Sequence, residues 1–488
     1  MNETQHTFFN SVLKLAVLAL LCFFMAVAVS HSHHSDELHL LPGEDTHKTY
    51  STESADELSD DVEVVKPWKV IVQDKNYNGA WLVAGDVDGD GEADIVSCRS
   101  LMEGGSHYTA SAIVHRLDGS VLWKWGKPEG MRDSLGSDFA CQIYDWNGDG
   151  VQEVVLSTKS AGKTWLVELD GPTGKEKRRF EIPHDAADCI VFCNLSGNAR
   201  ATDLLVKTRY EQIWAFNYAG KQLWHSNMPG GLRTAHQPVP IDMDGDGKDE
   251  IQAGFAMLNS DGSVRWVLDR SDPIFARGKS LEDAHLDCAR VFKLAEKPED
   301  TRLVLTFCQG ERIAMVDGLG KILWDIPFHH FESVDIGKVV ADAPGKQIVV
   351  DIPYAPPGQQ PVWIIDEWGK QLGEVLNEGS RFHRLIDWTD NGTESILIAE
   401  PPALYDGTTG EKIAVFEMPL PEGEEFPAVS RGTEKFICWV GDMTGDGRQD
   451  IIFGTNNPGG LIYIYKNQHG KMPKVKHALG TGTNVTLY

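Results

Sequence analysis

The chain has 488 residues, of which 41% are hydrophobic and 9% aromatic, and it contains 48 glycines. The apolar content is enough for a large core, and the glycine content indicates many turns. The formal net charge is −27, which argues against binding nucleic acid because an acidic surface repels a polyanion at long range. An anionic polysaccharide remains compatible where a basic patch or bound calcium reverses the local field.

Residues 1–30 have the pattern of a signal peptide. One lysine precedes the apolar run "LAVLALLCFFMAVAV", and small residues follow at Ala26 and Ala28. The run is shorter than the roughly 20 residues that span a bilayer. We therefore expect a cleaved signal, a secreted or periplasmic protein, and no stable membrane insertion after cleavage. An uncleaved anchor is the alternative.

Residues 31–66 are polar and acidic, with few large apolar side chains. This composition predicts a disordered linker. Its "HSHH" segment has transition-metal ligands, although a solvated tail is the simpler interpretation. Beyond the signal, seven cysteines are scattered singly, at positions 98, 141, 189, 193, 288, 308 and 438. An odd number in an exported protein implies an unpaired thiol or a metal ligand, unless they are buried apolar residues.

Four nearly identical acidic loops begin at Asp86, Asp145, Asp242 and Asp442, with the sequences "DVDGDGEAD", "DWNGDGVQE", "DMDGDGKDE" and "DMTGDGRQD". Oxygen side chains at positions 1, 3, 5 and 9 around two glycines suit a hard cation such as Ca²⁺. Position 12 is never glutamate, so these are not helical calcium hands. Acidic turns without a metal are the alternative. The predicted calcium ligands are Asp86, Asp88, Asp90, Asp94, Asp145, Asn147, Asp149, Glu153, Asp242, Asp244, Asp246, Glu250, Asp442, Asp446 and Asp450.

Short apolar runs alternate with Gly/Asp turns along residues 67–488, which predicts an all-β domain. First strands start near positions 81, 141, 189, 237, 286, 333, 382 and 437, and a tryptophan follows a second turn in "RLDGSVLW", "NYAGKQLW", "NSDGSVRW" and "VDGLGKILW". Eight repeats of four antiparallel strands predict a β-propeller. Seven blades is the alternative count, because modules five and six are diverged. The segment "WKVIVQD" is expected to supply the outer strand of the last blade.

The propeller geometry separates the loops onto two faces. The acidic loops join first and second strands, whereas the starts of first strands share the opposite face with the loops between second and third strands. Polar residues gather there in the sequence and suggest an anion site, although each histidine is individually compatible with core packing. These residues are His107, Lys159, Lys163, Tyr210, Arg233, His236, His285, Cys308, Gln309, His329, His330, Tyr354, Arg381 and His383.

A second metal site is predicted on the same face. His285 begins a first strand and Cys308 ends the neighbouring antiparallel strand, so they should lie near each other. With Cys288 and His330 (or His329) they offer the nitrogen and sulfur ligands that suit Zn²⁺. No short ligand spacing marks this set.

The acidic loops resemble the FG-GAP repeats of integrin α-chain propellers. The chain from about Trp68 to Tyr488 resembles bacterial propeller polysaccharide lyases, namely rhamnogalacturonan lyases and ulvan lyases. The resemblance rests on "DLLVKTRYEQIWAF", "TAHQPVPIDMDGDGKDEI", "EDAHLDCARV" and "GTGTNVTLY". It implies cleavage of a uronic-acid-containing polysaccharide by β-elimination, in a monomer stabilised by calcium, and some ulvan lyases carry zinc.

By this resemblance Tyr210 is the base or acid, His236 is its partner and Arg233 neutralises the substrate carboxylate. His107, Lys163, Arg381 and His383 are then expected to bind substrate. Arg209 is expected to point away from Tyr210, because neighbours on a strand alternate in direction. One departure from the family is the first strand "SDFACQIYDW" of the second module, which has no histidine. The alternative function is a non-catalytic propeller that binds carbohydrate or protein.

Overall fold

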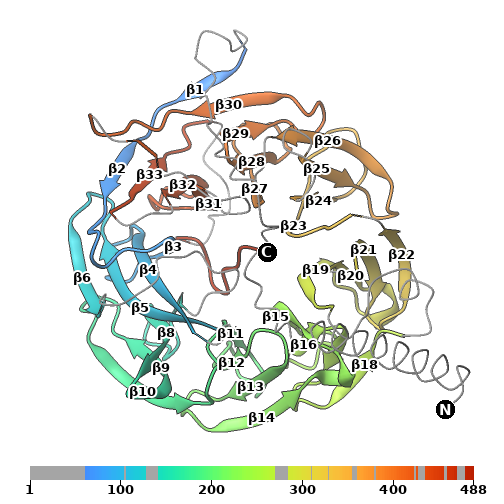
Figure 1. Ribbon diagram of the computed structural model, residues 1–488. Helices are drawn as coiled ribbons and strands as arrows, with labels where there is room; N and C mark the ends of the chain where they lie inside the picture. Colours follow the sequence, from blue (N-terminus) through green and yellow to red (C-terminus); the bar gives the residue numbers. More distant parts are fainter. Residues whose placement is uncertain are drawn as a thin grey trace, which may run out of the picture. The chain divides into compact units, whose positions relative to one another are not determined.

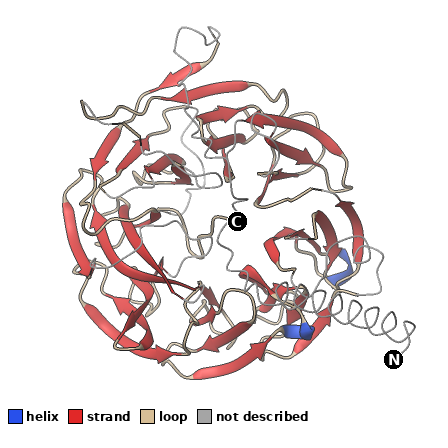
Figure 2. Cartoon of the chain, in the orientation of Figure 1, coloured by secondary structure: helices blue, strands red, loops and turns tan. Residues whose placement is uncertain are grey.

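The computed structural model describes residues 61–103, 106–127, 141–269, 284–308, 310–327, 329–353, 360–377, 381–422, 425–426, 435–455, 459–469 and 479–488. All of them belong to one compact unit that spans residues 46–488. The predicted signal peptide lies outside the described residues. No helix in the described part of the chain is long and apolar enough to cross a membrane. Figure 2 shows that strands make up most of the ordered chain.

The strands pair in successive antiparallel groups of four. The first four groups are β3 (Trp81–Gly85), β4 (Asp94–Glu103), β5 (Ser106–His115) and β6 (Val121–Gly126); β7 (Cys141–Tyr144), β8 (Glu153–Ser160), β9 (Lys163–Leu169) and β10 (Glu176–Ile182); β11 (Ile190–Cys193), β12 (Asp203–Lys207), β13 (Gln212–Phe216) and β14 (Gln222–Asn227); and β15 (Thr234–Ile241), β16 (Glu250–Gly254), β17 (Ala256–Leu258) and β18 (Val264–Val267). We call these units one to four. A short 3₁₀ helix, η2 (Pro229–Gly231), precedes β15.

Units five to eight continue the pattern, with a second 3₁₀ helix, η3 (Pro298–Asp300), between β19 and β20. Their strands are β19 (Leu286–Lys293), β20 (Arg302–Phe307), β21 (Arg312–Asp317) and β22 (Ile322–Pro327); β23 (Val334–Gly337), β24 (Gln347–Asp351), β25 (Gln360–Ile365) and β26 (Gln371–Asn377); β27 (His383–Ile386), β28 (Ser395–Ala399), β29 (Pro402–Tyr405) and β30 (Lys412–Phe416); and β31 (Phe436–Gly441), β32 (Asp450–Thr455), β33 (Leu461–Tyr465) and β2 (Lys69–Val72). The predicted all-β fold with four-stranded antiparallel sheets is confirmed.

Two N-terminal strands join the last units. β2 pairs antiparallel with β33, with Lys69 opposite Ile464, so the predicted outer strand "WKVIVQD" does complete unit eight. β1 (Glu63–Val65) adds to unit seven by pairing parallel with β30. The predicted linker was therefore drawn too long at its end, because residues 63–65 form a strand. Residues 31–60 of that linker lie outside the described residues.

Tryptophans on the fourth strands of units one, three, four and five connect each of these units to the next. The indole N–H of Trp123 donates to the Gly171 carbonyl at 2.6 Å, and that of Trp266 donates to the Gly318 carbonyl at 3.0 Å. Trp224 and Trp324 donate in the same way to the second turns of the following units. Gly320 has a φ of 82° and its Cα lies against the Trp266 ring. Any other residue at this position would have a strained backbone, and its Cβ would clash with the indole. The sequence motif thus forms a repeated contact between units.

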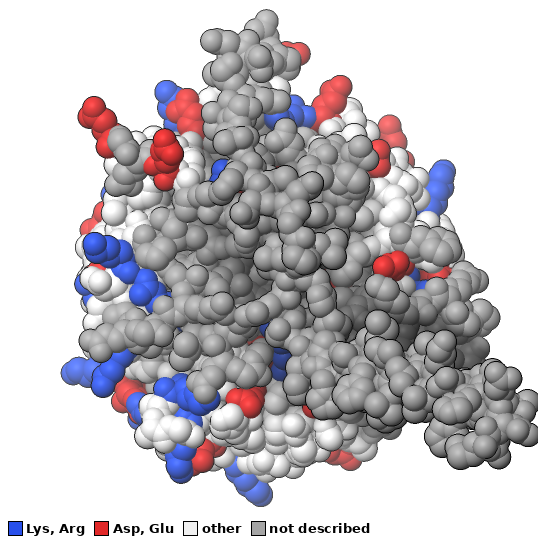
Figure 3. Space-filling view, in the orientation of Figure 1, with Lys and Arg blue, Asp and Glu red and all other residues white. Residues whose placement is uncertain are grey.

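Side-chain packing links the first and eighth units as well. The rings of Trp81 and Trp439 meet edge to face with centroids 5.4 Å apart, and both side chains are buried. In Figure 1 the units follow one another in chain order around the C-terminal residues. Lysine and arginine alternate with aspartate and glutamate over the coloured surface in Figure 3, so no single-sign field covers the part of that face that is described.

The segment 479–488 runs along the inner strands, from beside the ends of β31 and β3 at Asp442 and Ala84 to the start of β27 at Arg384. Its backbone and side chains form hydrogen bonds with seven of the eight units. The partners are Ala84 of unit one, Gln142 of unit two, Phe192 of unit three, Gln237 of unit four, Arg290 of unit five, Arg384 of unit seven and Asp442 of unit eight. Val485, Leu487 and Tyr488 of this segment are buried. A single stretch of chain therefore contacts nearly every unit at its inner strand.

The cysteines are dispersed through this core. All seven beyond the predicted signal are free thiols, and six are buried, with Cys308 half-buried. The interpretation of most cysteines as small apolar core residues agrees with this burial.

Candidate active site

The strand β15 has a candidate catalytic histidine near its start and an acidic loop after its end. His236 lies near its start, and Asp242 follows its last residue, Ile241. The two positions therefore lie toward opposite ends of one strand, which is irregular between Thr234 and Val239. The start of β15 also pairs with the start of β19 through Ala235 and Leu286. That pairing brings the polar residues before β19 to His236.

Tyr210, His236 and His285 form a tight aromatic group. The Tyr210 hydroxyl lies 3.4 Å from His236 Nε2, and the Tyr210 ring stacks on His285 with centroids 3.9 Å apart. The backbone N–H of Thr234 donates to the Tyr210 carbonyl at 2.7 Å, which holds the loop after β12 against β15. The predicted proximity of Tyr210 and His236 is therefore present, although they come from units three and four.

Asp287, which sequence analysis did not single out, lies at the centre of the histidines. Its Oδ1 lies 3.4 Å from His236 Nε2 and 3.3 Å from His285 Nε2, and its Oδ2 lies 3.5 Å from His330 Nε2. Burial acts to raise the pKa of this carboxyl, but the hydrogen bonds from His236 and His285 and the charge of His330 outweigh it and hold the pKa below its ordinary value. Asp287 is therefore an ionised group that orients these rings.

A second buried carboxylate continues the network. Glu332 Oε2 lies 3.0 Å from His330 Nε2, and its Oε1 accepts a hydrogen bond from Arg381 Nε at 2.9 Å. Burial works against the charged form of Glu332, yet the Arg381 guanidinium lowers the pKa of the carboxyl. Burial also disfavours the charged form of His330 and so acts to lower its pKa, but the hydrogen bond with Glu332 outweighs burial and raises the pKa above its ordinary value. His330, Glu332 and Arg381 form one charged chain.

Cations surround the Tyr210 ring. The guanidinium carbons of Arg209 and Arg233 lie 5.3 and 5.8 Å from the ring centroid, and Lys207 Nζ lies 5.9 Å from it. Arg209 Nε donates to the Tyr210 hydroxyl at 3.1 Å. The expectation that Arg209 points away is wrong, because β12 ends at Lys207 and strand alternation does not apply in the loop that follows.

Lys207 and Asp188 form an ion pair beneath this loop. Both side chains are 0% exposed, with Lys207 Nζ 3.3 Å from Asp188 Oδ2, and Lys207 Nζ also donates to the Arg209 carbonyl. A buried charge without its partner would be strongly unfavourable. The pair therefore fixes the backbone that presents Arg209 and Tyr210.

Tyr488 of the closing segment stacks on His236, with centroids 4.3 Å apart and planes 9° from parallel. Its hydroxyl accepts a hydrogen bond from Arg381 Nη2 at 2.8 Å. Sequence analysis used "GTGTNVTLY" only for its resemblance. The signal that could have identified this residue is an aromatic side chain in a segment that has no place in the four-strand repeat.

Two of the four predicted zinc ligands, Cys308 and His330, lie near each other. Potential ligand atoms of Asp287, Cys308 and His330 lie within 4.8 Å of each other, as do those of His236, His285 and Asp287. His285 thus belongs to the second group. Cys288 joins neither group: its side chain packs in the hydrophobic core that contains Val304 and Val350, and burial raises its pKa to about 11. Asp287 takes the place predicted for Cys288.

The other predicted rim residues lie apart from this network. His383 is buried, its Nε2 lies 3.1 Å from the Val349 carbonyl, and burial lowers its pKa to about 4, as in a core histidine. Lys163 is exposed and pairs with Glu181 at 2.5 Å. His329 packs edge to face with Trp363, so His330 is the member of that pair in the network. Gln309 and Tyr354 lie outside the described residues.

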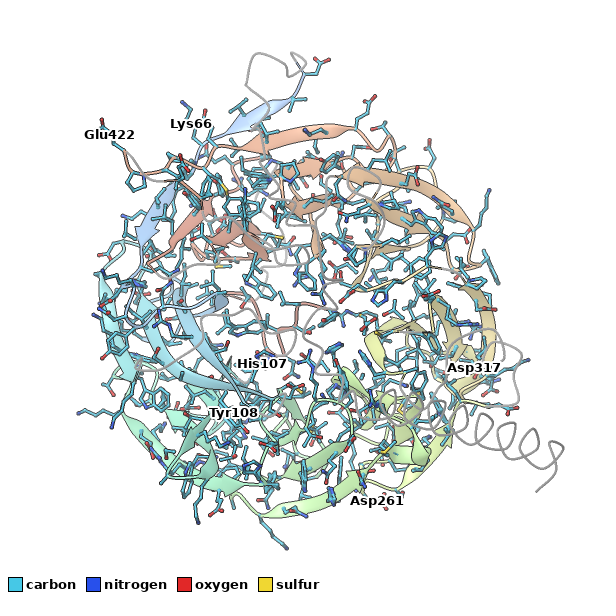
Figure 4. The ribbon with its side chains drawn as sticks, viewed as in Figure 1. Lys66, His107, Tyr108, Asp261, Asp317 and Glu422 are labelled. Carbon is cyan, nitrogen blue, oxygen red and sulfur yellow. The ribbon has the colours of Figure 1, made fainter. Side chains whose placement is uncertain are left out.

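His107 lies on β5 and is buried. Its neighbours Ser106 and Tyr108 donate to the backbone carbonyl and to the carboxylate of Asp185, at 2.7 and 2.8 Å. In Figure 4 His107 lies much nearer the middle of the view than Asp317.

The four acidic loops share one backbone arrangement. In the first, Asp86 accepts the N–H groups of Gly89 and Gly91, while buried Asp94 accepts those of Val87 and Asp88. The loops at Asp145, Asp242 and Asp442 repeat these bonds at positions 1 and 9. The φ angles of Gly89 and Gly91, 80° and 92°, are those that glycine adopts readily.

Only some of the predicted oxygens gather closely. Within the described residues, groups of three carboxylates form at Asp86, Asp88 and Asp90 and at Asp242, Asp244 and Asp246. The other two loops have Asn147 and Thr444 at position 3. Burial and then the charge of Asp88 raise the pKa of Asp94 to about 7. This crowding of negative charge fits the donor set of a hard cation.

No protein-family model matches the chain. Two curated relatives are rhamnogalacturonan lyases of Bacillus subtilis (strain 168): the endolyase YesW is 24% identical over 442 residues, and the exolyase YesX is 24% identical over 455 residues. The alignments cover 77% and 79% of this chain, and 66% and 70% of those proteins. The chain thus spans about two thirds of the length of these relatives.

The fold is similar to solved structures of such proteins. The crystal structure of YesW matches with a TM-score of 0.58 at 18% identity, covering 83% of this chain and 77% of that chain. The V. cholerae biofilm matrix protein Bap1 matches with a TM-score of 0.57 at 14% identity, covering 87% and 94% of the two chains. The likeness in structure concerns the fold, which does not by itself select a function.

Proposed function

We propose that this protein is an exported polysaccharide lyase that cleaves a uronic-acid-containing polysaccharide by β-elimination. The observation that carries the proposal is the Tyr210 hydroxyl, 3.4 Å from His236 Nε2 and beside Arg209 and Arg233. The sequence similarity to rhamnogalacturonan lyases supports the reaction class. The polymer is the partner, and the working unit is a monomer.

The scaffold in this proposal is a closed eight-bladed propeller. Its support is the pairing of β2 with β33, the Trp81–Trp439 contact and the tryptophan bonds between successive units. Radial closure protects sheet edges. It also places the starts of inner strands from different blades around one axis, where Tyr210, His236 and Arg381 lie within one network.

The reaction requires a proton acceptor, a proton donor and charge neutralisation. Arg233 balances the uronate carboxylate, which makes the hydrogen at C5 more acidic. Tyr210, ionised by transfer of its proton to His236, removes that hydrogen, the electron pair forms the C4–C5 double bond, and the C4–O bond breaks. Tyr210 then protonates the departing oxygen. Asp287 Oδ1, which faces the same Nε2, stabilises the imidazolium that forms on His236, and the imidazolium returns its proton to Tyr210 after the leaving oxygen is protonated. Arg209 stabilises the phenolate electrostatically.

Two kinds of metal fit the donor sets. The oxygen-rich loops at Asp86 and Asp242 suit calcium and would brace the face opposite Tyr210. The nitrogen, sulfur and oxygen donors of His330, Cys308 and Asp287 suit zinc. A zinc ion held there would supply fixed positive charge near the substrate carboxylate. The chain's own residues bind the polymer and move the protons.

The test uses the purified, calcium-loaded protein on a panel of ulvan, pectic and other uronate polymers. Cleavage by elimination creates a conjugated unsaturated uronate, which is detected by its ultraviolet absorbance. Tyr210→Phe should lower kcat by about 10²- to 10⁴-fold, because it removes the proton-transferring hydroxyl and retains the ring. Absence of new absorbance on every polymer with folded wild-type protein would contradict the proposal.

A propeller that binds carbohydrate without cleaving it is the second candidate. The first strand of unit two, "CQIY" in β7, lacks the histidine expected from the lyase resemblance. This candidate predicts binding with unchanged polymer length and an unchanged affinity in Tyr210→Phe. Size-exclusion chromatography of the polymer after incubation separates the two functions.

A further inference from the structure

Tyr488 reaches two parts of the candidate active site at once. Its ring stacks on His236 at a centroid distance of 4.3 Å, and its hydroxyl accepts a hydrogen bond from Arg381 at 2.8 Å. The side chain is 1% exposed. Both contacts are made by a segment that lies outside the repeated four-strand units.

The segment itself is held in place on several sides. The Gln142 side chain bonds the backbone of Val485 in both directions, at 2.9 and 3.0 Å. Asn484 exchanges two bonds with the backbone of Phe192, at 2.7 and 2.8 Å. Arg290 donates to the backbone oxygen of Tyr488. The position of the Tyr488 ring is therefore fixed independently of His236.

A fixed ring limits the movement of its neighbour. His236 has Tyr488 parallel to one side, while Tyr210 and His285 meet it edge to face, with centroids 5.2 and 4.9 Å away. Asp287 directs His236 Nε2 but, as a single acceptor, does not define the plane of the imidazole. The parallel Tyr488 ring restrains that plane.

The hydroxyl has a separate task. Arg381 donates to Glu332 on one side and to Tyr488 on the other. Removing the phenolic acceptor would take away one of the two hydrogen-bond directions that Glu332 and Tyr488 impose on the Arg381 guanidinium. Phe382, the next residue, also packs edge to face on Tyr488, with centroids 5.6 Å apart. The hydroxyl thus fixes the direction of a cation on the rim.

We propose that Tyr488 is a positioning residue that sets the ring plane of His236 through stacking and the direction of Arg381 through its hydroxyl. The inference rests on the proposed lyase function for its kinetic consequence. Its structural content, the orientation of two named side chains, does not depend on which reaction occurs.

The kinetic test separates ring from hydroxyl. Tyr488→Leu removes the stacking surface and should lower kcat by about tenfold or more, since small misplacements of a catalytic group are costly. Tyr488→Phe keeps the ring and should raise KM with little loss of kcat. Thr481→Ala, in the same segment, removes the bonds to Ala84 and should leave both constants near wild type. Melting temperatures establish that all three variants fold.

Equal losses of kcat in Tyr488→Leu and Tyr488→Phe would overturn the proposal, as would wild-type kcat in Tyr488→Leu. Crystal structures of the wild type and Tyr488→Leu provide a readout without substrate: the His236 ring should rotate and lose its approach to Tyr210. An unmoved His236 overturns the inference. If the wild type cleaves no polymer, the lyase proposal fails, and the structures alone decide the role of Tyr488.

Discussion

A single buried carboxylate organises the candidate site. Asp287 accepts from His236 and His285 with one oxygen and faces His330 with the other. Groups that orient a reacting side chain affect the catalytic rate even though they do not contact the substrate. The proposed lyase mechanism therefore depends on a residue that was not among the sequence candidates.

Asp287→Asn should lower kcat about 10- to 100-fold, because the neutral amide orients the imidazoles less strongly than the carboxylate does. The matched control is Cys288→Ala, the neighbouring residue on β19, whose side chain packs in the hydrophobic core. Steady-state kinetics on a cleaved polymer, with melting temperatures for both variants, make the comparison. Wild-type kcat in Asp287→Asn would remove this residue from the mechanism.

The sequence allowed prediction of some contacts across units but not of others. Tyr210 and His236, which come from units three and four, were paired through the family resemblance. Asp287 was read only as part of "EDAHLDCARV", since its role appears when β15 and β19 pair at Ala235 and Leu286. Arg209 was misassigned because β12 ends at Lys207, so strand alternation does not extend to Arg209 and Tyr210.

The fourth strands are the elements that join neighbouring units. Their tryptophans were visible in the sequence as "DGSVLW" and its relatives, which is why the repeat could be recognised. Each indole donates to the turn before the fourth strand of the next repeat. Because both the tryptophan and this turn recur in the repeats, the contact between units recurs with them. Strand order within units followed from periodicity, whereas β1 escaped prediction because its composition resembles the acidic linker.

Trp266→Phe should lower the free energy of unfolding by about 1–2 kcal/mol, because the Gly318 carbonyl loses its donor and the smaller ring fills less of the space beside Gly320. Trp368→Phe is the matched control, since the Trp368 side chain is 75% exposed. Urea unfolding of both variants measures the difference. Equal stability of the two variants would show that the indole bond between units four and five contributes nothing.

At the scale of the whole molecule, we expect calcium binding at the acidic loops to raise the stability of the folded protein. Removal of calcium with a chelator should lower the melting temperature, because crowded carboxylates such as those at Asp242 then repel one another. Asp246→Asn should abolish more of this calcium-dependent shift than Asp446→Asn, the equivalent position in the loop that has Thr444. Calorimetry with and without calcium, together with metal analysis, tests this order. The same shift in both variants would contradict it.

The pairing of β2 with β33 joins residues that are almost four hundred positions apart in the printed sequence, and the segment 479–488 then touches strands from both halves of the chain. Such contacts have high sequence separation and slow the search for the native state. We expect early portions of the nascent polypeptide to wait, with unpaired strand edges, until synthesis has reached the final strands. Chaperones that shield those edges would therefore increase the yield of folded protein without changing the free energy of unfolding.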